Sequence, residues 1–255
     1  MRIVHYLNQF FGGIGGEEHA DTEPQVHDEP VGPGRLLEQV LGEDAQIVRT
    51  IICGDNYGTE NMDSLTAFVI EKTKEAQADL FVAGPCFEAG RYGVAAAGLC
   101  VAVSSELVIP VVTGMAAENP GVDLYRQSLF IVDSGQNAAA MRDVLTKMSE
   151  MAHKLAEGCQ IGSPEEEGYI ARGILKDAFV EDTAAERLVA MLSAKVKGED
   201  FASELPAPSF PAINAPAPVV DMSKAKVAII TDGGLVPVGN PDNISAWAAT
   251  NWGAY

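Results

Sequence analysis

The sequence predicts an α/β fold: a parallel sheet flanked by helices, flavodoxin-like or Rossmann-like, with the start of a second α/β unit at the C-terminus. Short apolar runs rich in β-branched residues recur, helix-like stretches separate them, and glycine-rich loops follow several of them. Runs that are apolar throughout are typical of parallel strands covered on both faces. Helices that alternate with such runs indicate βαβ units with right-handed crossovers.

The predicted elements alternate regularly over the first part of the chain. Strands are expected at 2–7, 46–53, 80–83, 109–113 and 129–132. Helices are expected at 34–41, 62–77, 90–103 and 136–157. The second of these helices is preceded by Asn61, which supplies helix-start chemistry before the run TAFVIEKTKEA.

The pattern changes after residue 157, which suggests further segments. We expect a first α/β domain at 1–160, a helical segment at 161–204, a proline-rich crossing segment at 205–224, and an incomplete second α/β unit at 225–255. Five prolines between Glu204 and Asp221 exclude helix and central strand there. The last segment repeats the design of the opening, a strand followed by a glycine-rich loop. One strand and one loop cannot bury their own apolar faces, so we expect this piece to pack on the first domain or to be completed by another chain or a missing segment. A chain that ends as a second unit begins is expected to be a fragment.

Composition limits the classes of function. The chain has 255 residues, 47% of them hydrophobic, and a formal net charge of −19. Such a surface repels phosphate backbones, which argues against nucleic-acid binding. No run is long enough to span a membrane, and the N-terminus lacks the features of a signal peptide. Four cysteines without CxxC spacing indicate reduced thiols, so we expect a soluble cytoplasmic protein.

The candidate site follows from strand order. Parallel strands bring their carboxyl ends to one edge of the sheet, and ligands bind in the crevice there. The loops after the strands carry polar and glycine residues, among them Gln9 and Asp55. The residues that we expect to bind substrate are Asn8, Glu17, Asn56, Tyr57, Cys86, Glu88, Arg91, Tyr92, Thr113, Asp232 and Gly233. The loop at 232–234 is expected to face the others across a cleft between the two units.

Two residues of the GPCFEAGRYG loop have two interpretations each. Cys86 precedes a helix start, where a thiol has a lowered pKa and can act as a nucleophile, but a free cysteine is more often a small buried hydrophobe. Arg91 can bind a substrate carboxylate through its planar guanidinium, or it can form a local salt bridge with Glu88. A pair of strand-end thiols, Cys53 and Cys86, also suggests an acid racemase, although both belong to the same half of the chain.

We expect this chain to bind neither a dinucleotide nor a metal. The glycine-rich loop FFGGIGGEE lacks the third glycine of a dinucleotide motif and places Glu17 and Glu18 where a pyrophosphate needs free amides. His19 and His27 flank an acidic loop that offers Asp21 and Asp28, and solvated loop residues are the simpler interpretation of all four.

Long blocks of the sequence resemble the selenoprotein B subunit of the glycine/sarcosine/betaine reductase family. They are VHYLNQFFGGIGGEEHAD, ICGDNYGTEN, AGPCFEAGRYGVAAAG and TDGGLVPVGNPDNI, and the resemblance extends over essentially all of the chain. Family members continue beyond this point, and their selenocysteine lies in that later part. The resemblance therefore implies that none of the four cysteines of this chain replaces it.

The resemblance implies reductive cleavage of a C–N bond in a small amine carboxylate. In the family a partner subunit carries a pyruvoyl group, the selenolate attacks the α-carbon, and the carboxymethyl group passes to the small selenoprotein A. These partners, and an oligomeric assembly, are expectations for this chain, which alone is expected to be inactive. A non-catalytic binding or scaffolding fragment is the alternative from another class of function.

Overall fold

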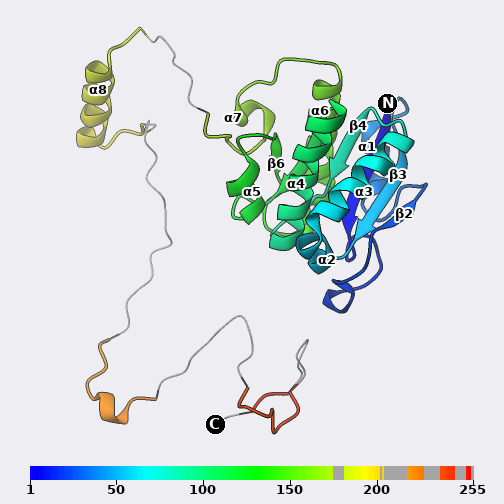
Figure 1. Cartoon of the computed structure of the whole chain (residues 1–255). Coiled ribbons are helices and arrows are strands. Elements are labelled where there is room, and N and C mark those ends of the chain that lie inside the picture. The colour runs from blue at the N-terminus through cyan, green and yellow to red at the C-terminus, as the bar shows by residue number, and fades with distance from the viewer. Residues whose placement is uncertain (175–180, 202, 204–216, 227–235, 245–250, 254–255) are drawn as a thin grey trace. The chain divides into compact units, whose positions relative to one another are not determined.

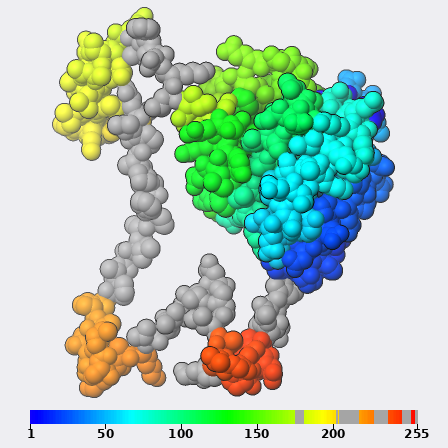
Figure 2. All heavy atoms as spheres, viewed as in Figure 1, coloured from blue at the N-terminus to red at the C-terminus, as the bar shows by residue number. Residues whose placement is uncertain are grey.

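The computed structural model describes residues 1–174, 181–201, 203, 217–226, 236–244 and 251–253. Its contacts divide the chain into two compact units, Met1–Phe179 and Val180–Tyr255. The first unit contains the sheet (Figure 1), and its described residues, 1–174, pack closely against one another (Figure 2). No helix in the described ranges is long and apolar enough to cross a membrane.

The sheet has six strands in the order β2-β3-β1-β4-β5-β6. Their bounds are β1 Arg2–Asn8, β2 Gln25–His27, β3 Gln46–Cys53, β4 Leu80–Ala83, β5 Val111–Met115 and β6 Ile131–Asp133. All neighbours are parallel except β2, which pairs antiparallel with β3 at the edge. The predicted α/β class with a mostly parallel sheet is therefore confirmed. The five parallel strands have the flavodoxin-like order, in which the first strand lies between the second and the third.

Helices cover both faces of this sheet. Their bounds are α1 Gly34–Leu41, α2 Asp55–Glu60, α3 Met62–Glu75, α4 Gly90–Leu107, α5 Pro120–Tyr125, α6 Met141–Ala156 and α7 Pro164–Glu167, with short 3₁₀ turns η1 Glu17–His19 and η2 Ala138–Ala140. Helices α1 and α6 contact each other on one face, and α3 contacts α4 on the other.

Side-chain alternation along β1 divides the core between these faces. Val4 and Tyr6 belong to the cluster that contains Leu65 of α3 and Leu99 of α4. Ile3 belongs to the cluster that contains residues of α1 and α6. A buried strand that points successive residues to opposite faces needs apolar residues at nearly every position, which explains the uninterrupted run that predicted it.

The second unit contains helix α8 at Ala184–Lys197 and the 3₁₀ turn η3 at Met222–Lys224. Thr183 caps α8 in a capping box with Glu186. The strand expected at 226–231 falls almost wholly outside the described residues, and so do Asp232 and Gly233.

The short elements α2, α5 and β2 were not predicted. The short helix α2 was expected to be a loop, since its sequence DNYGTE has little helix propensity. It forms where the carbonyl of Ala20 accepts hydrogen bonds from the N–H groups of Asn56 and Tyr57, at 2.9 and 3.1 Å. Gly54 permits this approach, because a Cβ there would lie 2.1 Å from the same carbonyl oxygen. The edge strand β2 was also missed.

Candidate active-site pocket

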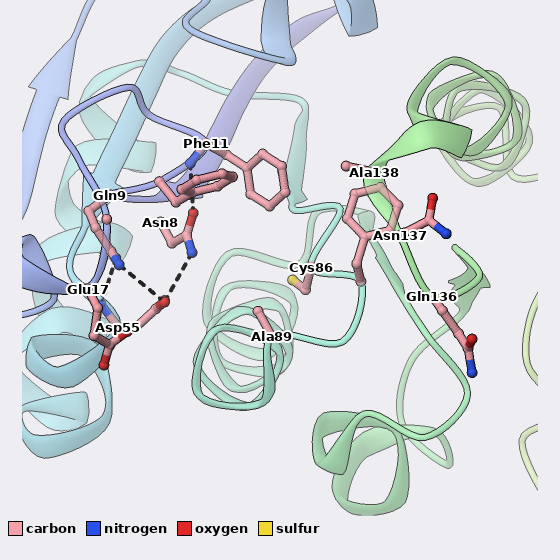
Figure 3. Close-up of a pocket in the computed structure, with 13 residues that line it drawn as sticks. Asn8, Gln9, Phe11, Glu17, Asp55, Cys86, Ala89, Gln136, Asn137 and Ala138 are labelled. Carbon is pink, nitrogen blue, oxygen red and sulfur yellow. Dashed lines mark hydrogen bonds between the residues drawn. The ribbon is translucent and has the colours of Figure 1, made fainter. Parts of the chain in front are cut away.

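A pocket of about 310 Å³ lies at the carboxyl edge of the sheet. Its lining comes from the loops after β1, β3, β4 and β6, and consists of Asn8, Gln9, Phe10, Phe11, Gly16, Glu17, Asp55, Cys86, Phe87, Ala89, Gln136, Asn137 and Ala138. The neighbouring strands β1 and β4 are followed by helices on opposite faces, so their loops diverge and leave a crevice between them. This is the position at which open parallel sheets bind ligands. Figure 3 shows the Asp55 side of the pocket facing the loop that carries Gln136 and Asn137.

A buried carboxylate forms the polar wall of the pocket. Asp55 accepts hydrogen bonds at Oδ2 from Asn8 Nδ2 at 3.1 Å and from Gln9 Nε2 at 3.4 Å (Figure 3). Gln9 Oε1 in turn accepts from the N–H group of Asp55 at 3.0 Å. Burial raises the pKa of Asp55 above its ordinary value, and the two amide donors act in the opposite direction.

Three phenylalanine rings supply apolar surface to the same pocket. The centroids of Phe10 and Phe11 lie 5.3 Å apart, and those of Phe11 and Phe87 lie 5.9 Å apart. Phe87 is almost fully buried, whereas Phe10 is exposed. A carboxylate beside aromatic faces suits a ligand that carries a positive charge.

The loop after β4 holds Cys86 in the pocket wall. Gly84 has a φ of +96°, a conformation that side chains disfavour, and a Cβ there would lie 3.1 Å from the Cys86 sulfur. Burial raises the pKa of the Cys86 thiol well above its ordinary value. The interpretation as a small buried residue therefore describes Cys86 better than that of a thiolate activated at a helix start. Burial likewise raises the pKa of Cys53, to about 12, so this pair does not support a two-thiol racemase.

Arg91 joins two loops at the rim. Its guanidinium forms a salt bridge with Glu17, which lines the pocket, and donates a hydrogen bond to Asn56. The side chains of Arg91 and Glu17 are 43% and 45% exposed, so both can exchange partners with solvent or a ligand. The local salt bridge expected with Glu88 is not formed, because the partner of Arg91 is Glu17; Glu88 is exposed.

The predicted substrate-binding residues thus fall into separate groups. Asn8, Glu17 and Cys86 line the pocket, and Asn56 and Arg91 interact at its rim. Tyr57 packs against the core, and Tyr92 is fully buried with its hydroxyl donating to the Tyr6 carbonyl at 3.2 Å. Thr113 is buried within β5.

Sequence reasoning did not select several residues that line the pocket. Gln9 and Asp55 were among the polar residues of the strand-end loops but were left out of the predicted site. The lining residues Phe11 and Asn137 belong to no sequence pattern that could have singled them out.

Comparisons with known proteins agree with the sequence resemblance. Residues 1–255 match the family described as "Glycine/sarcosine/betaine reductase selenoprotein B". The chain is 50% identical to "Glycine reductase complex component B subunit gamma" of Peptoclostridium litorale. It is 48% and 42% identical to "Sarcosine reductase complex component B subunit beta" and "Betaine reductase complex component B subunit beta" of Peptoclostridium acidaminophilum.

Each of these three alignments covers 100% of this chain and 58% of the relative, so the chain spans less than two thirds of their length. No solved structure matches. Since the family match extends over every residue, the chain belongs to the glycine/sarcosine/betaine reductase selenoprotein B family.

Proposed function

We propose that this chain is part of the substrate-binding subunit, protein B, of a cytoplasmic glycine, sarcosine or betaine reductase complex. The complex would cleave the C–N bond of a small amine carboxylate reductively. The family match supports the reaction class, and the observation that carries the site is the pocket at the carboxyl ends of β1 and β4. Its volume of about 310 Å³ is at the small end of ligand pockets, as expected for a substrate of this size.

The wider assembly is part of the same proposal. A pyruvoyl-bearing subunit and the small selenoprotein A would be partners of the whole protein, and the nucleophile would be a selenocysteine outside residues 1–255. Such a selenolate supplies a group that is ionised and strongly nucleophilic at neutral pH. The residues of this chain would bind and orient the substrate in the pocket and would not carry out the displacement.

The direct test is amine release by the complete complex that contains this subunit. We expect release from at least one of glycine, sarcosine and betaine under reducing conditions, measured separately for each substrate. A complex that contains all components and releases amine from none of the three would contradict the proposed function.

We propose that Arg91 binds the carboxylate of the substrate. This carboxylate would replace Glu17 as the partner of the Arg91 guanidinium. Arg91→Lys is expected to raise KM about ten-fold or more, because a point charge cannot reproduce the planar pair of donors. Steady-state kinetics of the complete complex measure this change. Arg126→Lys, which alters the arginine at the C-terminal end of α5, is the matched control. An equal KM for wild type and Arg91→Lys would remove Arg91 from the site.

A further inference from the structure

The buried carboxylate of Asp55 has its two oxygens in different environments. Asn8 Oδ1 accepts from the N–H group of Phe11 at 3.0 Å, so the NH₂ group of Asn8 is turned toward Asp55. Gln9 Oε1 accepts from the N–H group of Asp55, which turns its NH₂ group toward the same carboxylate. Both amides therefore donate to Oδ2, and their orientation is set by main-chain hydrogen bonds.

The second oxygen of Asp55 is left for another partner. Among the described residues, no hydrogen bond or salt bridge is made to Oδ1, and Asp55 lines the pocket. The residue is only 9% exposed. A largely buried carboxylate that is bonded at one oxygen only is costly for a protein to maintain. A cation bound in the pocket would complete its coordination and offset that cost.

The rest of the lining favours an organic ammonium group over a metal ion. The rings of Phe11 and Phe87 belong to the same pocket and offer faces to a positively charged, partly apolar group. The side chains that contact Asp55 are carboxamides that donate to it, and the carboxylate of Glu17, which also lines the pocket, is already paired with Arg91. The pocket therefore offers no second unpaired carboxylate of the kind that a hard divalent cation needs.

We infer that Asp55 is the anchor for the ammonium group of the substrate, with Asn8 and Gln9 as positioning residues that hold Oδ2 and leave Oδ1 available to the ligand. This inference rests on the proposed function and adds a residue that determines which ligands the pocket accepts. The substrate would then lie with its ammonium end at Asp55 and its carboxylate end toward Arg91. The positive charge of Arg91 also acts on Asp55, so the two residues are electrostatically coupled.

The test is Asp55→Asn in the complete complex, assayed with whichever of the three substrates the wild type uses. Loss of the charge-assisted contact, a hydrogen bond for glycine or sarcosine and an ion pair for betaine, is expected to raise KM roughly ten- to a hundred-fold, with a much smaller change in kcat. The rise of kcat/KM with pH that reflects ionisation of Asp55 should also disappear. Asp123→Asn, the same substitution at an exposed position of α5, should leave both quantities unchanged.

Gln9→Glu supplies a second variant of nearly the same shape. It keeps an oxygen to accept from the Asp55 N–H group but places a second carboxylate beside Asp55, which should move the rising limb of kcat/KM to higher pH. Either of two results would overturn the assignment of Asp55: a KM for Asp55→Asn within two-fold of wild type, or a rising limb of kcat/KM that is not shifted in Gln9→Glu. Amine release by the wild type would still support the proposed function in both cases. Absence of amine release from the wild type would contradict the proposed function itself.

Discussion

Acidification from pH 6.5 to pH 4 is expected to remove roughly 3 kcal/mol from the free energy of unfolding through His5 alone. His5 is fully buried in β1, and its Nε2 is hydrogen-bonded to the carbonyl of Gly84 at 2.7 Å. Burial lowers the pKa of His5 from 6.5 to about 4. Between these values the unfolded chain binds a proton that the folded chain does not, so stability is fully present above pH 6.5 and decreases as the pH falls toward 4.

The measurement is urea unfolding of wild type and His5→Gln at pH 7.5, 6, 5 and 4.5. At pH 7.5 His5 is neutral in both states, so the difference there gives the cost of the substitution apart from titration. The wild type should lose more stability than the variant as the pH falls, because glutamine does not titrate. Parallel curves for the two proteins would show that His5 does not carry the acid sensitivity. The turn at Gly84 precedes Cys86, so the same protonation should also disturb the pocket wall.

The central strands could be predicted from the sequence because packing on both faces requires apolar residues at most positions of the strand. The bounds of β3 and β4 agree with those expected, since short runs that are nearly uninterrupted in apolar character form strands where helices cover both sides of the sheet. The bounds of α1 agree as well. The short edge strand β2 has no such run of apolar residues. Only Val26 in it is aliphatic, and its pairing depends on main-chain hydrogen bonds to β3.

The candidate site was predictable in position but not in composition. The carboxyl ends of parallel strands meet at one edge, so Asn8 and Cys86 could be placed together without coordinates. Which side chains face the crevice depends on the turn of each helix and loop. Tyr92, in the first turn of α4, points into the core, while Asp55 reaches the pocket because the Ala20 carbonyl holds the start of α2. That long-range contact has no signature in the local sequence.

Asn119→Ala is expected to lower the free energy of unfolding by about 2–4 kcal/mol, because one buried side chain makes three hydrogen bonds that join the loop after β4 to the start of α5. Asn119 Nδ2 donates to the carbonyls of Phe87 and Ala89 at 2.9 and 3.1 Å. Its Oδ1 accepts from the N–H group of Gly121 at 2.9 Å and so caps α5. Alanine would remove all three hydrogen bonds and leave a void against Gly93, whose position would place a Cβ 2.1 Å from Asn119 Oδ1.

The same substitution should also weaken substrate binding. Asn119 does not line the pocket itself, but it is hydrogen-bonded to Phe87 and Ala89, which do. Chemical denaturation measures the stability, and KM in the complete complex measures the effect on the pocket. Asn137→Ala provides the comparison for stability, because Asn137 is exposed and its side chain caps the short turn η2 with one hydrogen bond, to Ala139 at 3.0 Å. That variant should lose about 1 kcal/mol or less. Equal losses for Asn119→Ala and Asn137→Ala would mean that the contacts of Asn119 with the loop after β4 add no stability beyond the helix cap. The position of Phe87 would then depend on the main-chain hydrogen bond that the Ala116 N–H group donates to the Phe87 carbonyl at 3.1 Å.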